Sequence, residues 1–192
     1  MIFDLITIFI LGGLLLTAIY TVLKYLGKFP DRTIDDVAPY LRPTDLETFE
    51  SILGPAEEFN FRLRFPAKQF RQIQNKRIHL LREYLSRMSH NALVLIEWGN
   101  MEWTGPQNEE RQKLAQELVQ AGVEFRLYSL LALAKLKMWI IFRPLLPALS
   151  LAELRKVAGI DAVRAYVRVR LAAESLGQTY GRVYCQELSA RL

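Results

Sequence analysis

The sequence has few of the side chains that build metal centres, with one cysteine and two histidines among 192 residues. A single cysteine, Cys185, excludes an intramolecular disulfide, as expected in a reducing compartment. His79 and His90 fall on one predicted helix, where His79 and Glu83 could share a metal ion. Two histidines and one carboxylate are too few ligands for a recognisable site. We therefore expect no metal ion.

Motifs for nucleophilic catalysis and phosphate binding are also lacking, because the chain has no glycine-rich phosphate loop and no Gly-x-Ser-x-Gly. No acidic pair falls where a loop would present it to a substrate. Cys185 lies in a stripe of small residues, which favours a buried small side chain over a reactive thiolate. The sequence thus predicts no catalytic residue and no cofactor, and we expect a protein that is not an enzyme.

The most prominent feature present is a run of nineteen residues without a charge, residues 5–23. As a helix it would be about 28 Å long, close to the thickness of a bilayer's hydrocarbon core. A cleavable signal peptide would need a basic start and a small-residue cleavage site, whereas this run follows Asp4 and continues to Lys24. A buried core helix would be shorter and carry a polar stripe. We therefore predict a retained transmembrane anchor within residues 1–28.

The charges beside the anchor predict its orientation. Lys24, Lys28 and Arg32 follow the run, while Asp4 and the amino terminus precede it. Basic residues tend to stay on the cytoplasmic side of a membrane. We accordingly expect a single-pass membrane protein with its N-terminus outside and the rest of the chain in the cytoplasm.

Small residues recur every fourth position within the anchor, at Gly13, Thr17 and Thr21. Such a stripe allows a second transmembrane helix to approach closely. The plainer interpretation, which we favour, is that glycine and threonine are simply tolerated in membrane helices.

Residues 29–58 are acidic and contain four prolines. We interpret them as a linker with short helices, since each proline disfavours helix at the residue before it. Thr44 and Glu47 have the spacing of a capping box, which would open a helix that ends at Gly54. Residues 59–192 would then form the cytoplasmic helical domain.

The sign of the charge reverses after residue 61, where eight basic residues up to Arg87 face Glu83 alone. Apolar residues at three- and four-residue steps predict a long helix over residues 66–98. Its outward side would carry a basic stripe of Arg64, Lys68, Arg71 and Arg82. We weigh two explanations equally, an internal or solvated face and contact with anionic lipid. Nucleic acid is not expected as a partner, because the nearby phenylalanines have the pattern of core residues.

Residues 98–106 contain Gly99, Gly105 and Pro106 and predict a loop. Trp98 and Trp103 would make it either a binding lip or, as we favour, a turn anchored in the core.

A further helix is expected to begin near Asn108 and to continue past Gly122. Its apolar part, residues 128–141, would be the central core helix, which we favour, or an in-plane segment on the bilayer with Lys135 and Lys137 reaching the headgroups.

The last predicted helix covers residues 161–188 and has small residues every fourth position. These are Ala173, Gly177, Gly181 and Cys185. Glycine inside a helix costs about 1 kcal/mol relative to alanine, which is explained if another helix packs closely on this groove. We favour a packing helix from the same chain over one from another subunit.

Together these patterns predict an all-α fold, a transmembrane helix followed by a cytoplasmic helical bundle. The favoured function is a membrane-anchored scaffold or accessory subunit that presents helical surfaces to a protein partner, or to a second copy of itself, at the inner face of the membrane. Membrane lipids are the other expected partner. The alternative is a protein that handles lipids or small molecules, with a pocket formed around residues 128–147.

Overall fold

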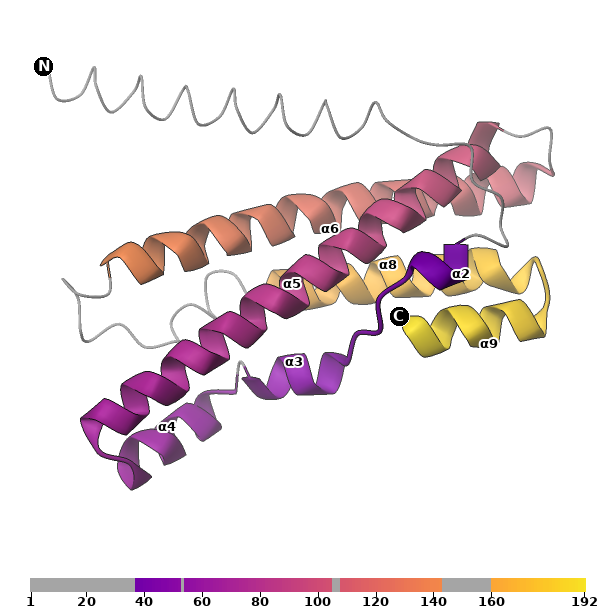
Figure 1. Cartoon of the computed structure of the whole chain (residues 1–192). Coiled ribbons are helices and arrows are strands. Elements are labelled where there is room, and N and C mark those ends of the chain that lie inside the picture. The colour runs from indigo at the N-terminus through magenta and orange to yellow at the C-terminus, as the bar shows by residue number, and fades with distance from the viewer. Residues whose placement is uncertain (1–36, 53, 105–107, 143–159) are drawn as a thin grey trace, which may run out of the picture. The chain divides into compact units, whose positions relative to one another are not determined.

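The computed structural model describes residues 37–52, 54–104, 108–142 and 160–192, which belong to one compact unit over residues 33–192. These residues are helical and contain no strand, which confirms the predicted all-α class for this part of the chain (Figure 1). The helices are α2 (Val37–Tyr40), α3 (Leu46–Ile52), α4 (Pro55–Arg64), α5 (Ala67–Thr104), α6 (Glu109–Phe142), α8 (Ile160–Gln178) and α9 (Arg182–Arg191).

The predicted anchor, with its packing residues Gly13, Thr17 and Thr21, lies outside the described residues. Among the helices that are described, none has the length and apolar content needed to cross a membrane.

Helices α5 and α6 form the central pair of this unit. They pack antiparallel, since Gly99 lies against Ala115 and Val119 while Gly122 lies against Ile96. A Cβ added at Gly122 would lie 2.5 Å from Cγ1 of Ile96, so glycine is what lets the two backbones approach here. As predicted, the second helix begins directly after Asn108 and continues past Gly122.

Burial changes along helix α5. Its first half buries one stripe of side chains, but residues 94–99 are buried without interruption. Residues 128–141 form the second half of α6, a helix that packs against both α5 and α8, and Ser129, Ala132 and Leu136 are buried there. The predicted loop over residues 98–106 is wrong as far as Thr104, where α5 ends, and the rest of it lies outside the described residues.

Helices α8 and α9 form a hairpin instead of the single predicted helix. Gly181 breaks the helix with φ of 115°, a conformation that side chains other than glycine rarely adopt. Helix α8 also packs antiparallel on α6, where the rings of Phe125 and Tyr166 have centroids 5.1 Å apart and Glu124 pairs with Arg168.

The described part of the acidic segment packs on α5 through core residues Val37, Leu41, Phe49 and Ile52. The cap of α3 differs from the predicted one. Asp45 accepts the backbone N–H and the hydroxyl of Thr48, and this pairing lowers the pKa of the Asp45 carboxyl. Helix α4, which the sequence analysis did not predict, then fills residues 55–64 before Pro66 and α5.

Candidate functional site

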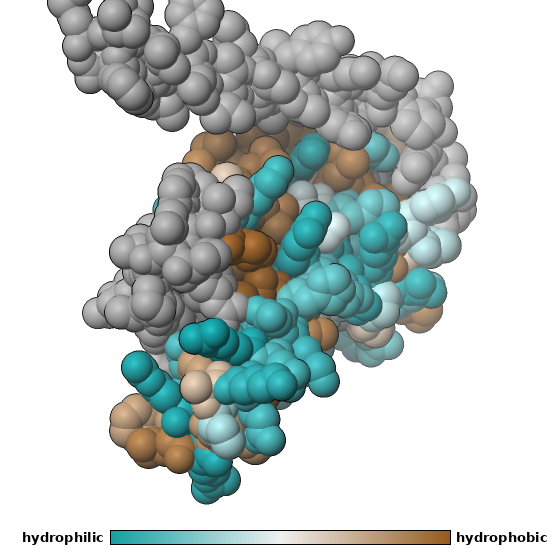
Figure 2. All heavy atoms as spheres, turned by 60° about the vertical axis from the view of Figure 1, so that its left-hand side comes forward, coloured by the Kyte–Doolittle hydropathy of each residue, from teal (hydrophilic) through white to brown (hydrophobic). Residues whose placement is uncertain are grey.

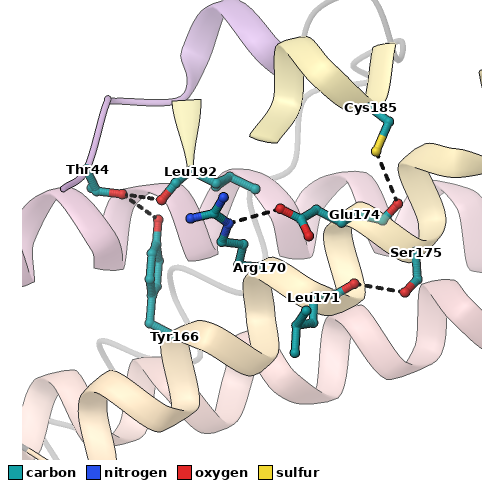
Figure 3. A network of polar contacts seen from close by, with 8 residues as sticks. All are labelled: Thr44, Tyr166, Arg170, Leu171, Glu174, Ser175, Cys185 and Leu192. Carbon is teal, nitrogen blue, oxygen red and sulfur yellow. Dashed lines mark hydrogen bonds and ion pairs between the residues drawn. The ribbon is translucent and has the colours of Figure 1, made fainter. Parts of the chain in front are cut away.

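A polar network joins the residue 42–44 segment to three distant parts of the unit. The Asn91 amide accepts from the backbone N–H of Arg42 and donates to its carbonyl, both at 2.8 Å. It also donates to the Tyr166 hydroxyl at 3.0 Å. Thr44 contacts that hydroxyl and donates to the Leu192 carbonyl at 2.6 Å (Figure 3). The network fixes the backbone at Arg42.

Tyr166 is fully buried, and this burial is the main influence on the pKa of its phenol. Desolvation raises the pKa of its phenol, and the hydrogen bonds with Thr44 and Asn91 oppose the shift. Thr44 therefore has a tertiary role in place of the capping role predicted from its spacing.

A groove opens beside this fixed segment, with a volume of about 620 Å³. One wall is the residue 42–43 segment and the other is a face of α5. The lining side chains are Arg42, Pro43, His79, Arg82, Glu83, Ser86 and Arg87. We call this the Arg42–Arg82 groove.

The charges in the groove are unbalanced. Glu83 is ion-paired with Arg87, whose guanidinium also lies over the Tyr84 ring at 5.9 Å. Arg42 and Arg82 are exposed, and neither forms an ion pair with another residue that the structure describes. Arg42 and Arg82 therefore line the groove without a carboxylate partner among the residues that the structure describes.

The predicted basic stripe divides among three places. Arg64 is the last residue of α4, and the chain bends at Phe65 before α5 begins. Lys68 and Arg71 lie in the first turns of α5, whereas Arg82 lines the groove about 16 Å further along the helix. All four side chains are exposed, but the register assumed for Arg64 fails at Pro66.

Exposed hydrophobic side chains gather at the α4 end of the unit. Phe59 is 63% exposed and Leu63 is 70% exposed, and Phe65 is also exposed. We call these three residues the α4 tip. Figure 2 shows hydrophobic side chains at the lower end of the molecule beside a broad hydrophilic surface. Arg62, Arg64, Lys68 and Arg71 supply the nearby positive charge.

A buried arginine holds α4 against α5. The Arg77 guanidinium donates to the Ile52 carbonyl and, at 3.4 Å, to the Gly54 carbonyl. Its centre lies 5.7 Å from the Phe61 ring centroid. Desolvation lowers the pKa of Arg77, although Glu58 and Glu57 partly oppose this shift. Arg77 therefore positions the helix that carries the α4 tip.

The predicted groove of small residues is filled by the chain itself. Ala173 and Gly177 lie on α8, and Leu188 of α9 packs on Gly177, 3.2 Å from where a Cβ would stand. Cys185 is on α9, with its thiol 3.8 Å from the Glu174 carbonyl (Figure 3). The favoured interpretation, a packing helix from the same chain, agrees with this contact.

The two tryptophans of the predicted loop have different environments. Trp98 is fully buried, with the rings of Tyr180 and Tyr184 at 6.1 and 6.0 Å. Trp103, five residues further along α5, is 46% exposed. Trp98 is therefore a core residue and takes no part in a binding lip.

An apolar stripe covers the outward side of α6. Val123, Leu127, Leu130 and Leu131 are exposed, while Phe125, Ala132 and Leu136 on the opposite side are buried. This spacing of three and four residues places the exposed side chains on one helical face.

Among the described residues, no three histidine, cysteine, aspartate or glutamate side chains come together as a metal site. The chain matches no protein-family model, no curated protein and no solved structure.

Sequence reasoning missed the α4 tip and the participation of Arg42. The signal for the tip is the alternation of apolar and polar residues over residues 59–65, whose phenylalanines the sequence analysis assigned to the core. Arg42 carried no comparable signal, because a tertiary network brings it to α5.

Proposed function

We propose that this protein is a membrane-anchored helical scaffold or accessory subunit, held by residues 5–23 and resting on the anionic inner leaflet through the α4 tip. The observation that carries the proposal is the α4 tip itself, an exposed hydrophobic cluster beside four basic side chains.

The two kinds of side chain at this end favour the same surface. Exposed aromatic and aliphatic groups gain about 25 cal/mol for each Å² of apolar area that leaves water. Lysine and arginine near an anionic leaflet each contribute about 1 kcal/mol. Phe59 and Leu63 can enter the boundary between headgroups and acyl chains while Lys68 and Arg71 remain at the phosphates. A tethered unit needs only this weak second contact to keep one orientation.

The apolar stripe on α6 supports the scaffold part of the proposal. Contiguous hydrophobic surface on a folded unit commonly marks a protein interface. Leu127, Leu130 and Leu131 offer such a surface along one helix, so we assign the protein partner to α6. The partner surfaces proposed from the sequence, at Gly177 and Trp98, are occupied by the chain's own residues.

The test places an environment-sensitive fluorophore at the tip of the full-length chain. Leu63→Cys, in a Cys185→Ser background, is labelled and reconstituted into nanodiscs of phosphatidylcholine with or without phosphatidylglycerol. We expect a blue shift of the emission with the anionic lipid, which is reduced by salt because surface charges are screened. Reversing the charge in Lys68→Glu and Arg71→Glu should abolish the shift.

The matched control is the same fluorophore at Val183→Cys on α9, since Val183 is 81% exposed but lies outside the α4 tip. Its emission should stay that of a probe in water. An equally water-like signal from position 63 in anionic nanodiscs would contradict the tip contact. Failure of the chain to enter nanodiscs at all would contradict the anchor.

A further inference from the structure

We propose that the Arg42–Arg82 groove is a binding site for the doubly charged phosphate group of a phosphate monoester. This site is separate from the α4 tip and does not depend on the proposed function. Three features of the groove favour such a ligand, namely a fixed wall, an excess of positive charge and the size of the opening.

Both walls of the groove are held in place before any ligand arrives. Arg42 has its N–H and its carbonyl bound by the Asn91 amide at 2.8 Å. Arg82 is on the long helix α5, where His79 and Ser86 occupy neighbouring turns of the same face. The fixed backbone at Arg42 and the helical backbone at Arg82 limit the entropy cost of binding to the ordering of two side chains.

The charge in the groove favours an anion with two negative charges. Three arginines face one glutamate, and Glu83 is compensated by its ion pair with Arg87. Arg42 and Arg82 remain without an ion pair among the described residues. Guanidinium groups bind phosphate oxygens through paired N–H donors, and His79 and Ser86 add further polar groups.

The opening is larger than a bare phosphate needs. Its volume of about 620 Å³ falls within the range of small-molecule sites, roughly 300–1,000 Å³. There is therefore room for the organic body of the ester. A soluble phosphorylated metabolite and a lipid with a phosphate monoester headgroup share this chemistry.

The experiment titrates the full-length protein, in uncharged detergent micelles, with inorganic phosphate by isothermal calorimetry. We expect saturable binding that is weakened about tenfold by Arg42→Ala and by Arg82→Ala, since each removes charge-assisted hydrogen bonds. Arg164→Ala is the matched control, because Arg164 is an exposed arginine on α8 outside both the groove and the α4 tip. Its affinity should equal that of the wild type.

Two further titrations sharpen the result. Singly charged dimethyl phosphate should bind less tightly than inorganic phosphate. Short-chain phosphatidic acid and glycerol phosphate then identify the source of the phosphate group. Tighter binding of phosphatidic acid would assign a lipid headgroup, and equal binding of the two compounds would assign a soluble ester. Absence of phosphate binding, equal binding of dimethyl phosphate, or an equal loss in Arg164→Ala would each overturn the proposal. Unchanged thermal melting of the variants, as expected for exposed side chains, shows that they remain folded.

Discussion

The two halves of α5 differ far more than their sequences suggest. From Ala67 to His90 the helix buries one stripe and exposes a basic face, whereas residues 94–99 are buried on every side. Both halves have the same backbone geometry and no break separates them. The difference comes from the neighbours, since α6 packs against Gly99 while Trp98 contacts the aromatic residues that follow α8. Stability should therefore concentrate in the second half, and ligand contacts in the first.

The largest expected effect comes from truncating the two tryptophans of α5. Trp98→Ala should lower the free energy of unfolding by about 3–5 kcal/mol, because it leaves a cavity beside Tyr180 and Tyr184. Trp103→Ala should cost much less, since that ring is already 46% exposed. Urea unfolding followed by circular dichroism measures both values.

The paired design separates burial from residue type, because the same substitution is made at two positions five residues apart on one helix. Similar losses for both variants would contradict the view that stability is concentrated in the buried residues 94–99.

An intermediate effect is expected from Arg77, the one basic side chain that is buried in the first half of α5. Arg77→Ala leaves the Ile52 and Gly54 carbonyls without this donor. Hydrogen bonds that involve a charged group contribute about 1.5–3 kcal/mol each, so we expect a loss of this order. Hydrogen exchange should show the loss as faster opening of α4.

Arg71→Ala is the control, since its exposed side chain should leave both stability and exchange unchanged. If α4 kept its protection in Arg77→Ala, another contact would have to hold the α4 tip against α5. The tip fluorophore should also lose part of its blue shift in this variant.

The sequence predicted the long helices well, because their periodic apolar residues persist over many turns. The starts of α5 after Pro66 and of α6 after Asn108 followed from local signals. Their ends were harder to predict. Gly99 suggested a loop but serves helix packing, while Gly181 suggested packing but breaks the helix. The same residue type supports either role, and only the neighbouring helix decides between them.

The candidate sites were predictable only in part. Charge patterning identified Lys68, Arg71 and Arg82, since a basic run is visible in the sequence itself. Exposure of Phe59 and Leu63 was not visible, because aromatic and aliphatic residues are usually buried and nothing local shows that no element covers them. The groove depends on Asn91 holding Arg42, two residues 49 positions apart.

The smallest expected effect concerns pH and the Tyr166 hydroxyl. At neutral pH, Tyr166→Phe should lower the free energy of unfolding by about 1 kcal/mol, because the contacts with Asn91 and Thr44 are lost.

Burial raises the pKa of Tyr166 in the folded state above its ordinary value of 10.0. Above that value the unfolded chain releases this proton while the folded chain retains it. The wild type therefore loses stability as pH rises, and the variant lacks this contribution. The stability gap between the two should narrow as the pH rises above about 10, the ordinary pKa of tyrosine, towards the raised pKa of the folded state. Tyr40→Phe, at a half-exposed ring, corrects for general alkaline effects. A stability gap that stays constant or widens would show that water reaches Tyr166 and its hydrogen bonds with Asn91 and Thr44.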